Sequence, residues 1–218
     1  MAFPPKESHA MRRLTLATLA LTALLIGCGK STPEPEGPAK RQPCEADRST
    51  TVEPLSPVVI SDPPLENLLD LIERRLALAE PVALHKWDNA QPVHAARRVQ
   101  QVLANARNGA WRFKLAEERA AAFMAEQIEA NTSLQYQLLH HWQIQGQAPD
   151  HPRRDLQADV RPQLDTLQAE LLQGLADFDL NYRPDCAMRL AQAIDSRTQT
   201  PMHAMAMIRA TGQLCQNP

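Results

Sequence analysis

Five polar side chains have types and spacings that could bind a small anionic molecule. Arg75 and Lys86 are eleven residues apart in one amphipathic stretch. Eleven residues make about three helical turns, so the two side chains would share a helix face, about 16 Å apart at Cα. Arg98 follows in the next segment, while Asn131 and Gln135 lie four residues apart in a long later one. Residues with that spacing can point into one pocket, so the set could enclose a ligand between cations and amide donors.

Each of these residues has an ordinary explanation when it is taken alone. A single Arg or Lys on an amphipathic helix is usually solvated, and Gln135 would fit the surface of a long helix. Trp87 and Trp142 are typical of core packing or of a pocket wall. His140 and His141 suggest a metal, but adjacent helical residues face different directions. The chain also lacks a CxxC motif, and we predict neither a metal site nor a cofactor.

The segment that contains Arg75 and Lys86 carries a helical pattern of apolar residues. Asp62 precedes two prolines, an arrangement typical of a capped helix start. The apolar residues that follow at spacings of three and four predict a helix over 65–87; they are Leu65, Leu68, Leu69, Ile72, Leu76 and Ala79. Pro81 should kink this helix, because it lacks the backbone N–H that the preceding turn requires.

Similar patterns predict helices along the rest of the chain, and no period-two strand pattern appears. Their ranges are about 93–107, 112–145, 153–178, 184–197 and 201–215. Pro162 places the regular part of the fourth helix near its own position, and Thr200 is expected to cap the last one. The fold class is therefore predicted to be all-α, a bundle of about four main helices plus a C-terminal helical hairpin.

Composition and charge exclude several functional classes. The 218 residues include 44% hydrophobic but only 4% aromatic residues, which favours one packed helical domain of ordinary size. The formal net charge of −2 gives no overall attraction to nucleic acid, so we predict no nucleic-acid partner. The oligomeric state is left open, with a homodimer among the alternatives.

The first residues are typical of an export signal. Arg12 and Arg13 precede the apolar run 14–26, which is too short to span a bilayer comfortably. Residues 1–27 are therefore predicted to be a signal peptide, with either Met1 or Met11 as the start. The run ends in Leu-Ile-Gly-Cys28, which resembles a bacterial lipobox, although an ordinary signal peptide with an incidental cysteine is the alternative. The lipobox implies lipidation of Cys28, which would be the chain's one membrane attachment and, with glycine next, would direct it to the outer membrane.

Residues 28–64 are rich in Pro, Ser, Thr and Glu and are predicted to be a tether without a core of its own. Export also bears on the cysteines, since an oxidising periplasm would allow Cys186 and Cys215 to pair. That disulfide would close the C-terminal hairpin, predicted as 181–218. Cys44, in the tether, is left either free or in an intermolecular bridge.

Several short motifs occur together in a recognisable order between residues 65 and 215. They are ERRL around Arg75, PVALHKW around Lys86, PVHAARR up to Arg98, QIEANTSLQY around Asn131 and Gln135, and PDCAMRL at Cys186. In order and spacing they resemble the exported, gamma-type (AroQ-class) all-helical chorismate mutases. The resemblance implies an isomerase domain over 65–180 that rearranges chorismate to prephenate and needs no cofactor.

The resemblance also implies a role for each residue. Arg75 and Arg98 would contact carboxylate groups, and Lys86 would donate to a carboxylate and to the ether oxygen. Gln135 would donate to the same ether oxygen from its other side. Asn131 stands where relatives have a small hydroxyl residue, so its role is less defined.

Two positions depart from the family pattern. Ala95 stands where relatives often have an acid that accepts the substrate hydroxyl, with His94 beside it. Ala169 aligns with a position where some relatives supply another Arg, and Arg161 is a candidate replacement two helical turns away. These gaps favour an alternative, a lipid-anchored binding or sensor module without turnover. A third possibility is a structural envelope lipoprotein, which predicts an apolar or neutral bundle interior.

Overall fold

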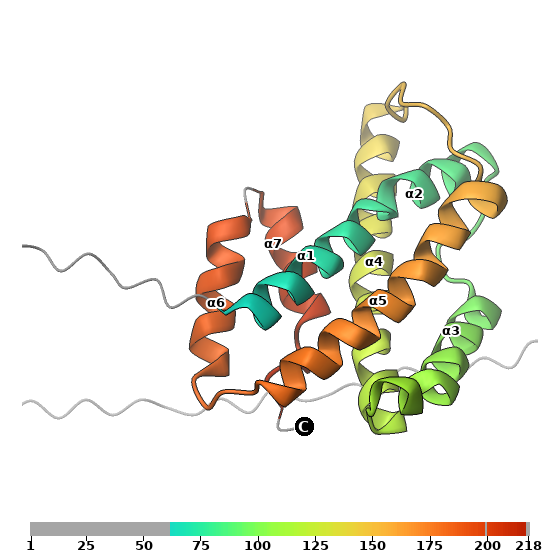
Figure 1. The fold of residues 1–218 in the computed structure, drawn as a ribbon. Helices are drawn as coiled ribbons and strands as arrows, with labels where there is room; N and C mark the ends of the chain where they lie inside the picture. The colour runs from blue at the N-terminus through green and yellow to red at the C-terminus, as the bar shows by residue number, and fades with distance from the viewer. Residues whose placement is uncertain (1–61, 199, 217–218) are drawn as a thin grey trace, which may run out of the picture. The chain divides into compact units, whose positions relative to one another are not determined.

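The structure, a computed structural model, describes residues 62–198 and 200–216, in which helices are joined by short turns and loops and no strand occurs. The predicted signal peptide, Cys28, Cys44 and nearly all of the predicted tether lie outside the described residues. Figure 1 shows α1 (Pro63–Ala77) and α2 (Ala79–Asp88) running in sequence across the bundle, with α5 (Arg161–Leu180) antiparallel beside them. None of the described helices is long and apolar enough to cross a membrane. The predicted all-α fold is therefore confirmed.

The predicted first helix is divided at Leu78, which lies between α1 and α2. Asp62 caps α1 as expected, its Oδ1 accepting a hydrogen bond from the backbone N–H of Leu65 at 3.4 Å. Pro81 was expected to kink the helix, but it lies in the first turn of α2, where the N–H that proline lacks has no helical partner in any case. The interruption therefore comes three residues earlier than predicted.

The long helix α4 (Glu117–Gln145) forms the centre of the bundle and packs against α2, α3 (Ala96–Gly109) and α7 (Pro201–Ala210). The predicted start at residue 112 is wrong, because residues 110–113 form a separate 3₁₀ turn. Lys114 then adopts a left-handed conformation with φ 58° and Ala116 is extended. The predicted start of the second helix is also three residues early, because Ala95, with φ −118° and ψ 75°, is not helical.

The segment before α5 differs from the prediction of a helix from residue 153. Residues 156–160 form a single π-helical turn, and the regular helix begins at Arg161. Asp155 starts this turn by accepting hydrogen bonds from the N–H groups of Gln157 and Ala158 at 2.7 and 2.8 Å. The expectation that regular helix begins near Pro162 is confirmed.

The core lies between α1, α4 and α5. The apolar face predicted for α1 is buried, as are Leu171 and Leu175 of α5. Gly174 permits the close approach of α5 to α1: a Cβ at this position would lie 3.1 Å from Leu71 Cδ1 and 3.2 Å from Leu68 Cδ1. Protein interiors are densely packed, so the side chains between two helices limit how closely the helices approach, and a glycine allows the closest approach.

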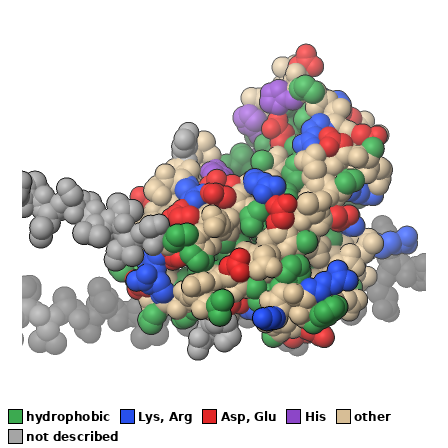
Figure 2. All heavy atoms as spheres, in the orientation of Figure 1, with side chains coloured by type: hydrophobic (Ala, Val, Ile, Leu, Met, Phe, Trp, Pro, Cys, Tyr) green, Lys and Arg blue, Asp and Glu red, His purple; other side chains and the backbone are tan. Residues whose placement is uncertain are grey.

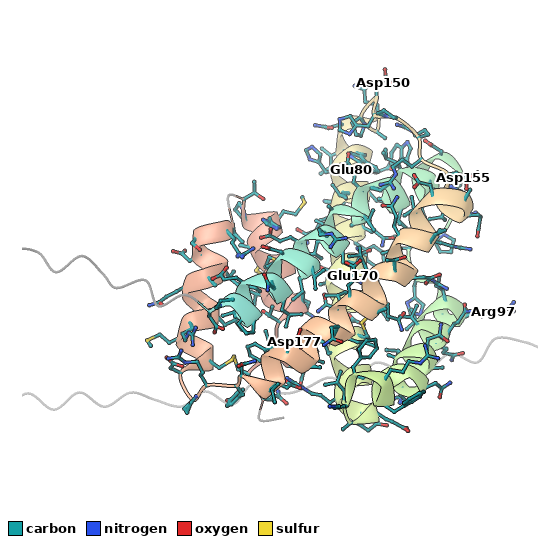
Figure 3. The ribbon with its side chains drawn as sticks, in the orientation of Figure 1. Glu80, Arg97, Asp150, Asp155, Glu170 and Asp177 are labelled. Atoms are coloured by element: carbon teal, nitrogen blue, oxygen red, sulfur yellow. A yellow bond between two sulfur atoms is a disulfide. The ribbon has the colours of Figure 1, made fainter. Side chains whose placement is uncertain are left out.

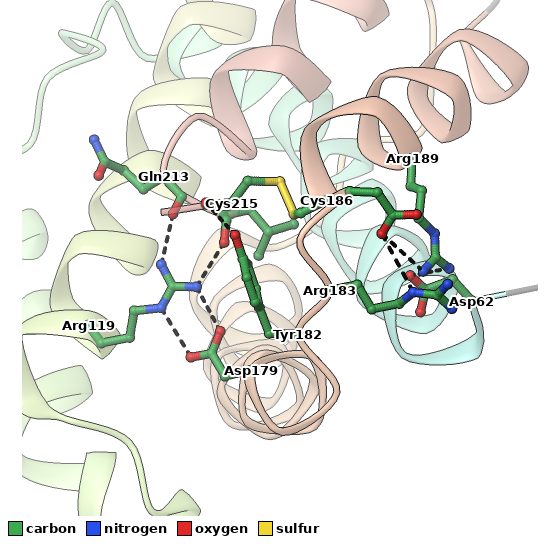
Figure 4. Close-up of a disulfide and its surroundings, with 11 residues drawn as sticks. Asp62, Arg119, Asp179, Tyr182, Arg183, Cys186, Arg189, Gln213 and Cys215 are labelled. Atoms are coloured by element: carbon green, nitrogen blue, oxygen red, sulfur yellow. Dashed lines mark hydrogen bonds and ion pairs between the residues drawn. A yellow bond between two sulfur atoms is a disulfide. The ribbon is translucent and has the colours of Figure 1, made fainter. Parts of the chain in front are cut away.

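The C-terminal hairpin consists of α6 (Cys186–Arg197) and α7, which pack against each other, and α7 also contacts α1 and α4. The predicted disulfide is present between Cys186 and Cys215. Figure 4 shows it beside Arg119, whose guanidinium binds the Asp179 carboxylate and donates to the carbonyls of Gln213 and Leu214. On the opposite side, Arg197 of α6 pairs with acidic residues of α1, which are Glu66, Asp70 and Glu73. The hairpin is thus fixed to the bundle at both ends.

Candidate active site

One cavity brings together all five side chains singled out from the sequence. Its empty space is about 810 Å³ when the open solvent at its mouth is included. Its polar lining comes from five helices; the residues are Arg75, Lys86, Arg98, Asn131, Thr132, Gln135, Arg161, Asp165 and Gln168. Val82, Val99, Val102 and Ile128 are among its apolar residues. A cavity with cations and amides on an apolar wall suits a small, charged organic molecule.

Arg75 reaches the cavity from α1 although it is only 6% exposed. Its Nε has no hydrogen-bond partner among the described residues. The pKa of Arg75 is lowered to about 10, chiefly by burial and also by the charge of Arg98, while the charge of Asp165 acts in the opposite direction. The guanidinium still carries its proton at neutral pH, so the cavity holds a buried cation with an unused donor. Such a group is strongly stabilised by an anion that replaces the lost water.

Lys86 projects from α2 towards α4. Its Nζ donates to Gln135 Oε1 at 2.7 Å and to the carbonyl of Val93 at 2.5 Å. Burial lowers the pKa of Lys86 to about 8, and the positive charge of Arg161 contributes in the same direction. The ammonium therefore faces neutral acceptors, and no carboxylate of the described residues pairs with it.

Asn131 and Gln135 are one turn apart on α4 and form a hydrogen-bonded relay. Gln135 Nε2 donates to Asn131 Oδ1 at 2.6 Å, and Asn131 Nδ2 donates to the backbone carbonyl of Arg75 at 3.1 Å. The relay connects α4 to α1 at the residue that supplies the buried guanidinium. Asn131 thus has a defined position, which the sequence pattern left open.

Arg98 enters from α3 near the cavity mouth, while its neighbour Arg97 points away from the bundle (Figure 3). Arg98 forms an ion pair with Asp165 of α5, and its other terminal nitrogen donates to Gln101. His94, the neighbour of Ala95, is exposed and does not line the cavity. Asp165 and Gln168 of α5 also line the cavity, and neither was predicted from the sequence. The sequence alone does not define which face of this helix is turned towards the cavity.

Arg161, rather than position 169, is the cationic position of α5 at this cavity. Ala169 faces a neighbouring hollow with Asn105 and Asn108, while Arg161 lines the cavity itself. Arg161, Asp165 and Gln168 are spaced by four and three residues, so one face of α5 presents all three. This spacing is visible in the sequence: residues four and three apart lie on one face of a helix, and it distinguishes the polar face of α5 from its apolar face.

Comparison with known proteins assigns the chain to a family. A family model described as chorismate mutase type II matches residues 66–136. A crystal structure of chorismate mutase from Burkholderia phymatum is 36% identical, with a TM-score of 0.65, and the match covers 70% of this chain and 96% of that one. The chain belongs to the chorismate mutase family.

Two further relatives support this family assignment. The chorismate mutase structure from Burkholderia thailandensis is 34% identical, with a TM-score of 0.66, and the match covers 71% of this chain and all of that one. The secreted chorismate mutase of Mycobacterium tuberculosis is 29% identical over 158 residues, 70% of this chain and 78% of that protein. The type II chorismate mutase match spans α1 to the middle of α4, the helices that supply Arg75, Lys86, Arg98, Asn131 and Gln135.

Two other features of the structure bear on the alternatives considered from sequence. Trp87 and Trp142 pack edge to face with ring centroids 6.1 Å apart, and neither lines the cavity. His140 and His141 are exposed, and the described residues contain no cluster of three or more His, Cys, Asp or Glu side chains arranged to hold a metal.

The basic and acidic side chains on the face drawn in Figure 2 are interspersed rather than gathered into a patch of one sign.

Proposed function

We propose that this protein is an isomerase that converts chorismate to prephenate in the cavity described above. The observation that carries the proposal is the convergence of Arg75, Lys86, Arg98 and Gln135 on one cavity in a chain of the chorismate mutase family. Within the substrate one ether C–O bond breaks while one C–C bond forms, and no atom is gained or lost. The protein's task is therefore to hold the reactive conformer and to stabilise the charge that develops.

The cations of the cavity form two groups that suit the two carboxylates of chorismate. Arg98 lowers the pKa of Arg75, whereas Arg161 lowers that of Lys86. Arg75 and Arg98 come from α1 and α3, whereas Lys86 and Arg161 come from α2 and the start of α5. A dicarboxylate held at both ends would be folded across the cavity. Arg guanidinium groups suit this role because they bind a carboxylate through two parallel hydrogen bonds.

Lys86 and Gln135 are the residues proposed to act on the ether oxygen. In the structure the Lys86 ammonium and the Gln135 amide already touch, at 2.7 Å. Nζ carries three protons and donates two of them here, and Gln135 Nε2 donates one of its two to Asn131. One donor on each side chain therefore remains for the substrate. As the ether bond breaks, negative charge grows on its oxygen, and these donors stabilise it more in the transition state than in the ground state.

Asn131 is proposed to position this pair and to help hold a carboxylate. Its Oδ1 fixes the Gln135 amide, and its Nδ2 donates one of its two protons to the Arg75 carbonyl, which leaves the other for a carboxylate. For the whole site, a rate gain of about 10⁶ requires about 8 kcal/mol of differential stabilisation. Two charge-assisted donors and fixed carboxylate contacts in a largely apolar cavity are sufficient for that magnitude.

The test is a turnover assay on the purified chain, following the loss of the ultraviolet absorbance of chorismate. The wild type should convert chorismate, Lys86→Met and Gln135→Ala should each lose at least about 100-fold in kcat, and His94→Ala should retain full activity. Binding of chorismate without turnover by the wild type would support the sensor-module alternative and overturn the enzyme.

We also propose that the chain is exported and carries lipid at Cys28, which lies outside the described residues. The curated relatives from Mycobacterium tuberculosis and Mycolicibacterium smegmatis are both named secreted chorismate mutases, and the Leu-Ile-Gly-Cys28 sequence fits lipid attachment. Metabolic labelling with palmitate should mark the wild type. The Cys28→Ala variant should remain unlabelled and move from the membrane fraction to the soluble fraction. Labelling of that variant would exclude Cys28 as the acceptor.

A further inference from the structure

Asp165 is the one carboxylate among the described residues that line the active-site cavity. It extends from the face of α5 that also carries Arg161 one turn earlier. A negative charge beside four cations weakens the attraction of the site for a dianion. Its presence therefore calls for a function other than general attraction of the substrate.

Only one of the two oxygens of the Asp165 carboxylate accepts a hydrogen bond from the described residues. Its Oδ1 pairs with Arg98, and its Oδ2 accepts no hydrogen bond from the described residues. The side chain is 54% exposed, at the mouth of the cavity, so a ligand can reach it. Its charge also acts inward, because it raises the pKa of the buried Arg75. Asp165 thus lies at the end of the cavity defined by Arg75 and Arg98.

The substrate of the proposed reaction has one polar group that the cations do not bind. Chorismate carries a ring hydroxyl as well as its carboxylates and ether oxygen, and this hydroxyl donates best to an anionic acceptor. The amide oxygens of Asn131 and Gln135 already accept hydrogen bonds. Ala95 contributes no oxygen from its side chain, and His94 is turned to solvent.

We infer that Asp165 accepts the hydroxyl of the substrate through Oδ2 while Oδ1 holds Arg98 against a substrate carboxylate. The inference rests on the proposed function and extends it to substrate recognition. In this arrangement α5 supplies from across the cavity the acid that position 95 of α3 lacks. The same side chain then determines specificity, because a ligand without the hydroxyl leaves a carboxylate oxygen unpaired at the rim of the site.

The experiment compares two substrates in two proteins. The substrates are chorismate and its analogue with hydrogen in place of the ring hydroxyl, and the proteins are the wild type and Asp165→Ala. The wild type should favour chorismate over the analogue by about 10- to 100-fold in kcat/KM. In Asp165→Ala that preference should fall to within about twofold, because the group that recognises the hydroxyl is gone.

A purely structural role would give a different pattern. If Asp165 only positioned Arg98, the variant would lose the same factor on both substrates and keep the wild-type preference, and the inference would be overturned. Asp165→Asn, which preserves shape and one acceptor, should show an intermediate preference. Asp177→Ala is the matched control, since Asp177 lies on α5 away from the cavity (Figure 3). Absence of turnover by the wild type would overturn the proposed function itself, a result distinct from an unchanged preference in an active variant.

Discussion

The ammonium of Lys86 donates to the side-chain oxygen of Gln135 at 2.7 Å, across the interface between α2 and α4. The two residues are 49 positions apart in the chain, and within the part that the structure describes no acidic side chain pairs with the lysine. The positive charge is therefore held in place but not neutralised. A charge in that state is available to an incoming negative oxygen and needs little rearrangement to reach it.

The Lys86–Gln135 contact predicts unequal losses from two substitutions. Lys86→Met removes the charge and should lower kcat by about 10³-fold, whereas Gln135→Ala removes a neutral donor and should lower it by about 10²-fold. In the double variant the losses should be smaller than their product, because the two groups act on one atom. Kinetic constants of the three variants measure this directly. Full additivity would show that the two side chains act on separate atoms.

The lowered pKa of Lys86 predicts an alkaline limit on activity. The ammonium is present below about pH 8 and is lost as the pH rises through that value, so kcat/KM should fall tenfold per pH unit above it. A bound dianion favours the charged form, so kcat should hold to higher pH than kcat/KM. Rate profiles from about pH 6 to about pH 10 give both limits. A flat kcat/KM profile across that range would contradict the assignment of Lys86.

The charge on Lys86, which the proposed reaction requires, slightly destabilises the folded protein. Its pKa is lower in the folded protein than in the unfolded chain, so the unfolded chain binds more protons between about pH 8 and its ordinary value. The unfavourable effect of burying this charge is therefore complete below about pH 8 and disappears as the pH rises towards about 10.4. Denaturant unfolding of the wild type and of Lys86→Met at neutral and alkaline pH should show the difference between them shrinking with pH.

Arg161 should contribute to both substrate binding and the alkaline limit. Arg161→Ala should lower kcat/KM about 10- to 100-fold through the loss of a charged carboxylate contact. It should also move the alkaline limit to higher pH, because the Arg161 charge lowers the pKa of Lys86. Arg161→Lys should restore the wild-type pH limit with only partial recovery of kcat/KM. Arg74→Ala serves as control, since Arg74 is exposed, pairs with Glu170 and does not line the cavity. Glu170 is labelled on α5 in Figure 3.

The disulfide should affect stability rather than the chemistry of the site. Cys186 and Cys215 are 29 residues apart, and closing a loop of that length stabilises the folded state by about 3–4 kcal/mol in the chain-entropy description. The Cys186→Ser, Cys215→Ser double variant should therefore unfold roughly 10 °C lower. Its kcat/KM at room temperature should stay within about twofold of the wild type, because neither cysteine lines the cavity. A scanning calorimetry run and one kinetic assay test both statements.

The helices were predicted from the short-range spacing of apolar residues, and the five cavity residues from short motifs that resemble those of a known family. The apolar residues of α1, α4 and α5 recur at helical intervals, and the short motifs around Arg75, Lys86 and Gln135 are local in the chain. The positions at which the helices are interrupted were predicted less well. Leu78, Lys114 and the π turn before Arg161 depend on how the helices pack against one another, and the residue types at these positions contain no strong turn signal.

The part of the site contributed by α5 was predicted only in part for the same reason, since Arg161 was named as a candidate and Asp165 was not. Whether Asp165 or Ala169 faces the cavity depends on the rotation of α5, and the π turn ahead of it shifts that rotation relative to an unbroken helix. A packing contact far along the helix then fixes the register. The positions of Arg161 and Asp165 became clear only from the arrangement of α5 against α1 and α3.

That packing contact is at Gly174, where the absence of a Cβ lets α5 lie against Leu68 and Leu71 of α1. Helix α1 also supplies Arg75 to the cavity, and α5 supplies Arg161 and Asp165, so the spacing of these two helices sets the width of the site. An added methyl group at position 174 would press on the ends of the Leu68 and Leu71 side chains, which would have to shift by a few tenths of an ångström. A change at this position would therefore reach the site only through helix packing, because it acts between the helix that carries Arg75 and the helix that carries Arg161 and Asp165.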